Sequence, residues 1–519
     1  MKKYVILFVL LISYISITAQ EESVDNYNPK YLNWQNKDLS INDVMGTSVN
    51  KLYEHIKDMK PKRTVIVAVI DSGIDIMHED LEGQIWTNDD EIPDNNIDDD
   101  DNGYTDDVHG WNFIGNANGE NVNYENYEYT RIVKKSEESD YLSKAKEQYN
   151  KELKYREDNI KGFKNFEKSY YSAKEFILKE TGVEVNSLED LKKVDSKNEN
   201  VLNAKNFLLE KYSLGFTEEA LEEVLEMNQE YLDYYLNLDF NPREIVGDDP
   251  NDFDDRNYGN NDVIGPSYDH GTSTAGVIAA VRGNGIGIDG IATDVEIMTL
   301  RVVPDGDERD KDIAIAIIYA VDNGANIINM SFGKQYSPNK EFVDFAVKYA
   351  QDHNVLLVHS AGNYGVDLDL YPSYPSDRLN DNTELKNWIS VGASSIEIDK
   401  YFVGIFSNYG KEYVDIYSPG VDVISLYGDS RYRASSGTSI AGPIVSGIAA
   451  LIWSYYPDLT ASEMVTILKE SSYKPKKNLK VLKPDLENEK RKKVKFSELS
   501  ESGGIVNAYE AFKLAGEYK

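Results

Sequence analysis

The sequence predicts an α/β protein: a three-layer, doubly wound, mainly parallel sheet that carries a large helical insertion. The first observation is a β-branched run over residues 64–70, which is typical of a strand buried on both faces. The second is the alternation of helical patterns with further β-branched runs after residue 270, which indicates parallel strands joined by helices. The third is a stretch over residues 121–239 that is rich in Lys, Glu and Tyr, contains no proline and favours helices.

The composition limits the classes of function. The chain has 519 residues, 41% of them hydrophobic, which is enough for one large domain with an insertion. Its formal net charge of −35 argues against nucleic acid as a partner, because neutralising phosphates requires a cationic face. Such an acidic surface instead attracts divalent cations. The sequence contains no cysteine, which excludes disulfides, thiolate metal sites and a cysteine nucleophile.

The N-terminus has the three parts of a secretory signal peptide. Lys2 and Lys3 precede an apolar run over Tyr4–Ile17, and small residues follow at Thr18-Ala19. The run is shorter than the roughly 20 residues that span a bilayer. Residues 1–20 are therefore predicted to be a signal peptide, with no stable membrane span after its removal, and an uncleaved N-terminal anchor is the alternative. We expect an exported, monomeric protein.

The rest of the chain divides into an extension, a main domain and an insertion. Residues 21–62 form a polar N-terminal extension, residues 63–120 and 246–519 form the α/β domain, and residues 121–245 form the helical insertion. The patterns predict, in order, a short helix at 49–59, a strand at 64–70, insertion helices at 136–178 and 217–236, a helix at 270–281, a strand at 295–303, a helix at 312–323, a strand at 326–330, a helix at 341–353, strands at 355–360, 388–393 and 421–426, a helix at 444–455, a basic loop at 479–495 and a final helix at 505–514.

An acidic loop after residue 91 has the alternating pattern of a calcium loop. Oxygen-bearing side chains fall at every second position and a glycine follows, so that several ligands can converge on one hard cation. The position that holds a bidentate Glu in an EF-hand is His109, so the flanking EF-hand helices are not expected. A merely acidic turn is the alternative. The candidate calcium ligands are Asp98, Asp100, Asn102, the backbone carbonyl of Tyr104, and Asp106.

Three chemically suitable residues lie at the ends of predicted elements. Asp71 follows the buried strand, and open α/β sheets place their chemistry at such carboxyl ends. His270 opens one helix and Ser439 opens another, where unsatisfied N–H groups and a positive helix end can stabilise an oxyanion. Pro443 is expected in the first turn of the second helix. Taken singly, a turn aspartate and a helix cap are the plainer interpretations of Asp71 and Ser439.

Together these residues supply a nucleophile, its general base and the carboxylate that orients the base. His270 would take the proton of Ser439 and later protonate the leaving amine, while Asp71 would hold the ring tautomer. Asn363, at the end of another predicted strand, would donate its side-chain N–H to the oxyanion together with the Ser439 backbone N–H. The set predicts acyl transfer to a serine.

Four motifs carry a resemblance to a known family. They are VIDSGIDIMHEDL (Val69–Leu81), DHGTSTAG (Asp269–Gly276), SAGN (Ser360–Asn363) and SSGTSIAGP (Ser435–Pro443). With these motifs in this order, the chain resembles the subtilisin-like serine peptidases, the subtilases. The resemblance covers about residues 63–112 and 258 to the end, and leaves the insertion out.

The resemblance implies a subtilisin-like fold, a secreted serine endopeptidase that acts on proteins or peptides through an acyl-enzyme, and structural calcium. It also implies residue roles. These are Asp71, His270 and Ser439 as the triad, Asn363 as the oxyanion donor, Ser331, Phe332 and Gly333 as the strand that binds substrate and lines the first specificity pocket, Ala361 and Gly362 as the other side of that pocket, and Asp80 as a calcium ligand.

The sequence departs from the family pattern at three places. The family's second histidine, three residues after the catalytic one, is Ser273 here, and we expect local repacking without loss of activity. The separation of Asp71 and His270 is long, because the insertion enters between them. The segment from Glu21 to Arg63 is short for a folding propeptide.

Two other functions stay open on the sequence alone. An inactive binding or scaffolding protein would use the acidic helical insertion, although no catalytic motif is broken. Deleting residues 137–236 separates these hypotheses, because a peptidase would keep activity on small peptides. A metallohydrolase would need histidines near the aspartates, and His109 is the only one beside the acidic loop.

Overall fold

The computed structural model describes residues 24–476, 478–488 and 490–518. The predicted signal peptide, residues 1–20, lies outside the described residues. The chain divides into two compact units. One, called here the sheet unit, lies within Glu22–Glu128 and Asn241–Lys519; the other, called the helical unit, is Tyr129–Phe240.

The sheet unit is built on seven parallel strands in the order β2-β3-β1-β4-β5-β6-β7. From β1 the chain adds strands on both sides, so the carboxyl end of β1 lies at the switch point where doubly wound sheets place their sites. This topology confirms the predicted fold class. The strands are β1 (Val65–Asp71), β2 (Gly110–Asn112), β3 (Val295–Arg301), β4 (Ile327–Met330), β5 (Leu356–Ser360), β6 (Trp388–Ser394) and β7 (Ile416–Pro419).

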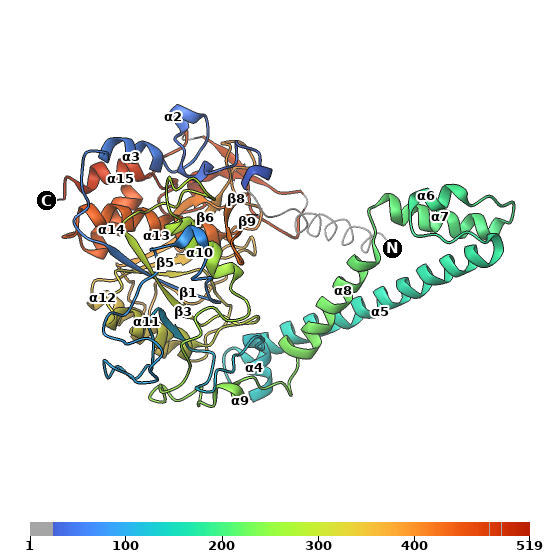
Figure 1. The fold of residues 1–519 in the computed structure, drawn as a ribbon, viewed down its shortest axis with the longest axis horizontal. Helices are drawn as coiled ribbons and strands as arrows, with labels where there is room; N and C mark the ends of the chain where they lie inside the picture. The colour runs from blue at the N-terminus through green and yellow to red at the C-terminus, as the bar shows by residue number, and fades with distance from the viewer. Residues whose placement is uncertain (1–23, 477, 489, 519) are drawn as a thin grey trace. The chain divides into compact units, whose positions relative to one another are not determined.

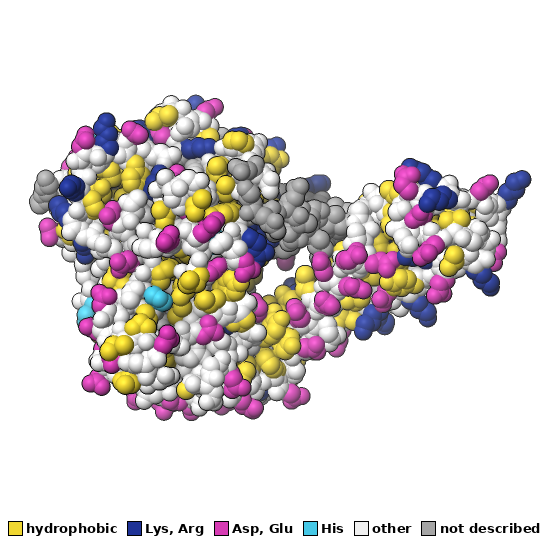
Figure 2. All heavy atoms as spheres, in the orientation of Figure 1, with side chains coloured by type: hydrophobic (Ala, Val, Ile, Leu, Met, Phe, Trp, Pro, Cys, Tyr) yellow, Lys and Arg dark blue, Asp and Glu magenta, His cyan; other side chains and the backbone are white. Residues whose placement is uncertain are grey.

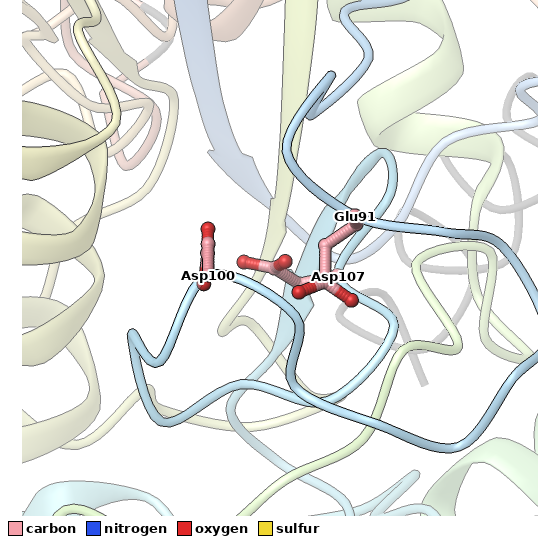
Figure 3. A group of neighbouring side chains, drawn as sticks. All are labelled: Glu91, Asp100 and Asp107. Carbon is pink, nitrogen blue, oxygen red and sulfur yellow. The ribbon is translucent and has the colours of Figure 1, made fainter.

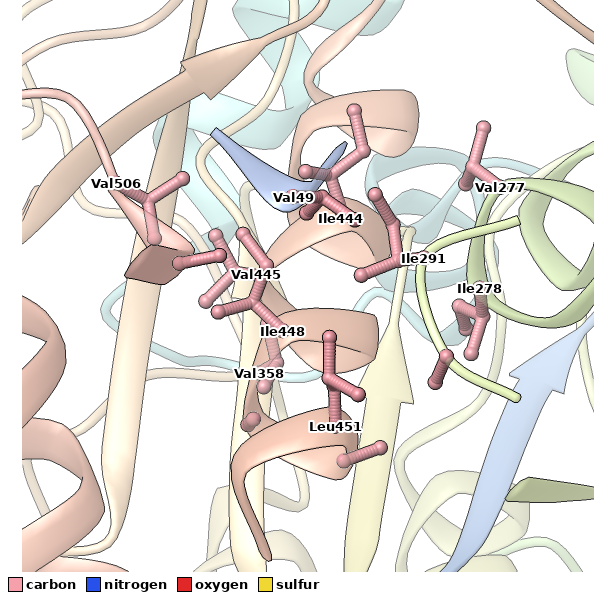
Figure 4. Packing of buried hydrophobic residues seen from close by; sticks show 14 of the residues in the cluster. Val49, Val277, Ile278, Ile291, Val358, Ile444, Val445, Ile448, Leu451 and Val506 are labelled. Carbon is pink, nitrogen blue, oxygen red and sulfur yellow. The ribbon is translucent and has the colours of Figure 1, made fainter. Parts of the chain in front are cut away.

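Helices cover both faces of this sheet (Figure 1). The side chains of β1 alternate between two cores: Val67 and Val69 belong to one, and Ala68 and Ile70 to the other. Figure 4 shows the first core, in which Ile444 and other residues of the longest buried helix pack beside the sheet. The first core takes α3 (Val49–Ile56), α10 (Asp269–Ala279), α13 (Thr438–Tyr455), α14 (Ala461–Glu470) and α15 (Ala508–Ala515), and the second takes α11 (Asp310–Asp322) and α12 (Lys340–Asp352).

Helix α13 forms the centre of the first core. It is the one helix of the described chain that is long and apolar enough to cross a membrane, and 94% of it is buried inside the protein. Pro443 is the sixth residue of α13, which corrects its predicted place in the first turn. A proline there removes the N–H that would bond the Ser439 carbonyl. That carbonyl instead accepts a hydrogen bond from Ser331 Oγ at 3.1 Å.

Two predictions for the sheet unit need correction. The strand predicted at 421–426 is present as β8 (Val423–Tyr427), but it does not join the parallel sheet: it pairs antiparallel with β9 (Arg431–Ser435) in a separate hairpin. A short β-branched run looks the same in both settings, and the turn residues Asp429 and Ser430 reveal the hairpin by their positive φ. The basic stretch at 479–495 also contains a hairpin, formed by β10 (Lys480–Leu482) and β11 (Lys493–Lys495).

The N-terminal extension is part of the sheet unit's core. Trp34 is fully buried, and its Nε1 donates to the Asp422 carbonyl at 3.0 Å. The Ala508 N–H donates to the Thr47 carbonyl at 2.8 Å. The remaining short elements of this unit are η1 (Val24–Asn26), η2 (Trp34–Asn36), α2 (Leu39–Asn42), η3 (Glu79–Leu81), α9 (Arg243–Val246) and η5 (Phe496–Glu498).

The helical unit has its own core. Tyr170 and Phe216 pack with ring centroids 4.9 Å apart, and Phe166 lies 5.2 Å from Phe216. Two helices that were not expected from the sequence lie between the two predicted ones. The elements are α5 (Leu142–Thr181), α6 (Leu188–Lys193), α7 (Glu199–Ser213), α8 (Glu218–Glu230) and the π-helical turn η4 (Tyr231–Tyr235), while α4 (Glu128–Lys135) begins at the last residue before this unit.

Acidic side chains are spread over the visible surface of the sheet unit in Figure 2 and do not gather in one patch. The same view shows Lys and Arg interspersed with them along the helical unit. On this face the negative charge is therefore carried by scattered, solvated carboxylates.

Candidate active site

The carboxyl end of β1 and the start of α10 bring an aspartate and a histidine together. Asp71 is the last residue of β1 and is 1% exposed. The Nδ1 atom of His270, the second residue of α10, lies 2.7 Å from Asp71 Oδ1. The carboxylate also accepts hydrogen bonds from the Ser72 N–H at 2.8 Å and from the Thr274 hydroxyl at 3.4 Å, which fix its orientation.

This pair sets the chemistry of the imidazole. An ionised carboxylate can only accept hydrogen bonds, so in the neutral imidazole Nδ1 of His270 carries the proton and Nε2 keeps its lone pair. The negative charge of Asp71 raises the pKa of His270 above the usual 6.5. The His270 side chain is 48% exposed, so Nε2 can be reached by a reacting group.

Glycines allow the two backbones to approach. A Cβ on Gly271 would lie 2.0 Å from the Gly73 carbonyl oxygen. Gly73 itself has φ +126°, and a Cβ there would lie 1.9 Å from the Ile264 carbonyl oxygen. Only residues without a side chain fit at these two positions, and their contact sets the distance between Asp71 and His270.

The N-terminus of α13 presents an unpaired N–H beside a hydroxyl. The Thr438 N–H donates to Asn363 Oδ1 at 2.8 Å, and the Ile440 N–H donates to the Gly437 carbonyl at 3.2 Å. Between them, the Ser439 N–H has no hydrogen-bond partner among the described residues. Ser439 therefore combines a hydroxyl, a free backbone donor and the positive end of a long helix.

The orientation of Asn363 follows from its partners. Its Oδ1 accepts from both the N–H and the hydroxyl of Thr438, at 2.8 and 2.9 Å, so Nδ2 is the free end of the amide. A Cβ on Gly437 would lie 2.9 Å from Ser439 Oγ, 3.5 Å from Asn363 Nδ2 and 3.7 Å from the Ser439 nitrogen. The hydroxyl and two donors thus surround one small space, which is open because residue 437 is a glycine.

The histidine and the serine come from helices that pack against each other, α10 and α13. Within the described chain no hydrogen bond joins Ser439 Oγ to the ring of His270. Such bonds are often long in a free enzyme and shorten when substrate binds. The structure therefore joins Asp71 to His270 by a direct hydrogen bond, and joins Asn363 to Thr438, the residue before Ser439.

The residues expected to bind substrate follow β4 and β5 and are tied to the start of α13. Ser331 Oγ accepts from Asn329 Nδ2 at 3.0 Å and donates to the Ser439 carbonyl. The Gly362 N–H donates to Thr438 Oγ1 at 2.9 Å, and Ala361, beside it, is buried. The two strand ends are thus held in register with the serine.

The segment Ser331–Gly333 is also held by a buried histidine that the sequence patterns did not indicate. His359, in β5, is 4% exposed, and its Nε2 lies 2.9 Å from the Phe332 carbonyl oxygen, so that Nε2 carries the proton. Burial lowers the pKa of His359 to about 4. The neighbouring Gly333 has no room for a large side chain, since a Cβ there would meet Ser373 Oγ at 3.1 Å.

The neutral His359 makes stability depend on pH. Its pKa in the folded protein is below the 6.5 of an unfolded chain, so its contribution is complete above pH 6.5 and is lost as the pH falls to about 4. We expect the free energy of unfolding to fall by about 3 kcal/mol over this interval on account of this group. Urea unfolding at pH 7.5, 5.5 and 4, in a Ser439→Ala background that prevents self-digestion, measures it. His359→Gln keeps an N–H for Phe332 but does not titrate, and should flatten the dependence; an unchanged slope would contradict this role.

The acidic loop gathers three carboxylates, but not the predicted set. Figure 3 shows Glu91, Asp100 and Asp107 facing one another, and one ligand oxygen of each lies within 4.8 Å of the others. Glu91 is 6% exposed and Asp107 is fully buried. The amide groups of Asn88 and Asn102 donate to both aspartates at 2.9–3.1 Å. Among the described residues, no Lys or Arg forms an ion pair with any of the three carboxylates.

The other predicted ligands shape the loop or lie elsewhere. Asp98 accepts from the backbone of Asn102 and Gly103, and Asp106 accepts from the backbone at residues 95 and 96. The ring of Tyr104 packs on Trp111, 5.2 Å between centroids. Asp80 is not part of this cluster. It is fully buried, and its carboxylate accepts hydrogen bonds from Asn284 Nδ2 at 2.7 Å and from the Ile288 N–H at 2.9 Å.

Glu91 and Asp107 carry no local signal that would have selected them. They lie outside the alternating run, and only the fold of the loop brings them to Asp100.

Ser273, where the family has a second histidine, is buried, and its hydroxyl has no partner among the described residues.

The chain is similar in sequence to a family of known proteins. The model of the subtilase family matches residues 62–498. A thermophilic serine proteinase of Bacillus sp. (strain AK1) is 37% identical over 222 residues, covering 42% of this chain and 49% of that protein. A thermostable alkaline protease of Halalkalibacterium halodurans is 35% identical, covering 38% of this chain and 52% of that protein. Subtilisin BL of Lederbergia lenta is 34% identical, covering 39% of this chain and 70% of that protein.

The chain spans about half the length of the first two of these relatives.

Proposed function

This chain belongs to the subtilase family, and on that basis we propose that it is a serine endopeptidase with Asp71, His270 and Ser439 as its triad. The observation that carries the proposal is the convergence of Ser439 Oγ, Asn363 Nδ2 and the free Ser439 N–H on one space. A tetrahedral intermediate needs this arrangement: a nucleophile on one side of the carbonyl carbon and two donors at its oxygen.

The reaction follows from these positions. Ser439 Oγ attacks the carbonyl carbon while its proton passes to His270 Nε2, and the carbonyl oxygen becomes an oxyanion held by Asn363 Nδ2 and the Ser439 N–H. His270 then gives the proton to the amide nitrogen, the C–N bond breaks and the amine leaves an acyl-enzyme. Water repeats the sequence, giving its proton to His270 and releasing the carboxylic acid and free Ser439. Asp71 stays ionised and stabilises the imidazolium.

The proposal includes a substrate path. The segment Ser331–Gly333 would pair with the substrate backbone on one side of the pocket, and Ala361 and Gly362 would form the other side. Support comes from the hydrogen bonds that tie both segments to residues 438 and 439. Proteins and peptides are the proposed substrates.

Digestion of an unfolded protein tests the function directly. The purified protein with calcium is incubated with casein, and new amino termini are counted by mass spectrometry. We expect internal fragments from the wild type and none above background from His270→Ala. A folded wild type that yields no new termini would contradict the proposal.

The pH profile tests the role of His270. Because Asp71 raises the pKa of His270, the base becomes neutral only above pH 6.5, so kcat/KM for a small peptide substrate should rise with pH to a plateau, with its midpoint above 6.5. Asp71→Asn should move the midpoint down and lower kcat by about 10⁴-fold, the size known for a related triad. A rate that stays flat from pH 5 to 9 in saturating calcium would contradict His270 as the base.

We further propose that calcium binds at Glu91, Asp100 and Asp107. The donor set supports this: three oxygens are close together, two of their side chains are buried, and within the described part of the chain no Lys or Arg pairs with them. Hard cations prefer such oxygen ligands. The Asn88 and Asn102 side chains adjoin the cluster and could turn their amide oxygens to the ion. Calcium would supply the positive charge that holds the loop together, with no part in the chemistry.

Removing calcium should therefore destabilise the protein. In a Ser439→Ala background, calcium at 100 times its Kd is expected to stabilise the fold by about 3 kcal/mol relative to chelator. Thermal unfolding with and without calcium measures the gain. Glu91→Gln should lose most of the calcium-dependent rise in Tm, and Asp90→Asn, which removes the same charge from the exposed neighbouring position, should keep it. An equal rise in Glu91→Gln and wild type would place the ion elsewhere.

Export is also proposed. The basic, apolar and small-residue parts of residues 1–20 support a signal peptide. The chain has no cysteine, so its composition does not distinguish an oxidising from a reducing compartment. N-terminal sequencing of the protein from culture medium and cell envelope tests it, since processing near residue 20 is expected and an intact Met1 in the cytoplasm would contradict it.

A further inference from the structure

The loop that carries Asn363 has no regular secondary structure of its own. It runs from Ala361, after β5, to Val366, and is called here the Asn363 loop. Asn363 is exposed, as a group that must meet substrate has to be. Its catalytic geometry therefore depends on what holds the surrounding backbone.

One buried side chain holds that backbone on both sides of the oxyanion donor. Asn408, between β6 and β7, is 2% exposed. Its Nδ2 donates to the Ala361 carbonyl at 2.8 Å. Its Oδ1 accepts from the N–H groups of Tyr364 and Val366, each at 3.1 Å. Its own backbone N–H donates to the Gly362 carbonyl at 2.9 Å.

The fit between this side chain and the loop is close. Gly362 has φ +98°, and a Cβ there would lie 2.6 Å from Asn408 Nδ2. The glycine thus gives the loop both its conformation and the room for the asparagine amide. Asn408 is in turn connected to the sheet, because Ser407 Oγ donates to the Asn408 carbonyl and accepts from the Ala393 N–H of β6, both at 3.0 Å.

Two sets of hydrogen bonds thus define the position of Asn363. The start of α13 holds the side chain through Oδ1, and Asn408 holds the backbone before and after it. The donor must lie about 2.7–3.1 Å from the developing oxyanion, and a misplacement of about 1 Å can cost 10²-fold in rate. Loosening the loop would therefore act on the transition state more than on substrate binding.

We propose that Asn408 is a positioning residue for the reaction, which acts through Asn363 by fixing the Asn363 loop against the sheet. The inference rests on the proposed function of Asn363 as the oxyanion donor. It assigns to Asn408 no contact with substrate.

Kinetics of Asn408→Ala on a chromogenic peptide anilide test the role. We expect kcat to fall about 10- to 100-fold, no more than the roughly 10²- to 10³-fold loss expected when the oxyanion donor itself is removed, with KM changed less than about threefold. Asn387→Ala is the matched control: Asn387 is equally buried and its Nδ2 donates to a backbone carbonyl, that of Val355, but at the amino end of the sheet. This control should keep wild-type kcat. Equal losses in the two variants would overturn the proposal.

A double-mutant cycle separates positioning from a general structural role. If Asn408 acts through Asn363, then Asn408→Ala should change kcat less than threefold in an Asn363→Ala background. The full 10- to 100-fold loss in that background would overturn the proposal. Asn408→Asp, which keeps the acceptor for Tyr364 and Val366, serves if the alanine variant does not fold, and the same two outcomes apply. Turnover by the wild type and its loss in Ser439→Ala test the proposed function separately.

Discussion

Replacing Ser439 by alanine is expected to lower kcat for peptide hydrolysis by a factor on the order of 10⁶, the size known for loss of the triad serine in subtilisin. The change removes the atom that forms the acyl-enzyme, and no other group of the site can take its place. The backbone N–H of residue 439, Asn363 and the substrate-binding segment remain, so KM should change little. Initial rates on a peptide anilide at high enzyme concentration measure the residual activity.

A serine from the same helix provides the control. Ser446, two turns along α13, is fully buried, and its hydroxyl donates to Asn329 Oδ1 at 2.9 Å. Ser446→Ala should lower stability through that lost hydrogen bond and leave kcat near that of the wild type. If Ser439→Ala kept more than about 1% of the wild-type kcat, the serine would not be the nucleophile of the mechanism proposed here.

Asn363→Ala should lower kcat by about 10²- to 10³-fold, because one of two oxyanion donors is lost. KM should be nearly unchanged, since the ground-state carbonyl oxygen lies short of the position that the oxyanion takes. The alanine variant also loses the oxygen that accepts from Thr438, so its effect contains a structural part.

Asn363→Asp removes this ambiguity. A carboxylate keeps an acceptor for the Thr438 N–H and hydroxyl, but has no N–H to donate and places negative charge beside the oxyanion. We expect it to be at least as inactive as Asn363→Ala and as stable as the wild type, measured by kcat and by urea unfolding in the Ser439→Ala background. An aspartate variant with near wild-type kcat would show that Asn363 acts only as a cap for α13.

Much of this arrangement could be predicted from sequence, because the signals are local. The β-branched run before Asp71 allows only a buried strand, and β1 is Val65–Asp71. The small residues around His270 and Ser439 indicate places with no room for side chains. In the structure Gly271 lies against the Gly73 backbone, and a Cβ on Gly437 would meet the Ser439 hydroxyl. The alternation of helices with strands predicts the parallel sheet that is observed.

What the sequence could not predict depends on partners far along the chain. The strand β8 pairs with β9 in a hairpin instead of joining the sheet, and only the pairing partner decides that. Pro443 is tolerated in the interior of α13 because the Ser331 hydroxyl, from another segment, donates to the Ser439 carbonyl that the proline leaves without an N–H partner. Glu91 and Asp107 reach Asp100 only through the folded loop.

Asn408 illustrates the same limit at the active site. Four of its hydrogen bonds go to a loop more than forty residues earlier in the chain, and no spacing or propensity marks it. A buried asparagine is selected by the backbone groups that it satisfies, and those are known only from the fold.

Labelling with a fluorophosphonate probe tests the central claim most directly, because the probe reacts with a serine only if the hydroxyl is activated. The folded wild type in calcium, Ser439→Ala and Ser446→Ala are labelled, and the modified peptide is identified by mass spectrometry. The account predicts a single label on Ser439 in the wild type and in Ser446→Ala, and none in Ser439→Ala. A wild type that is folded yet unlabelled, or a label that persists in Ser439→Ala, would contradict it.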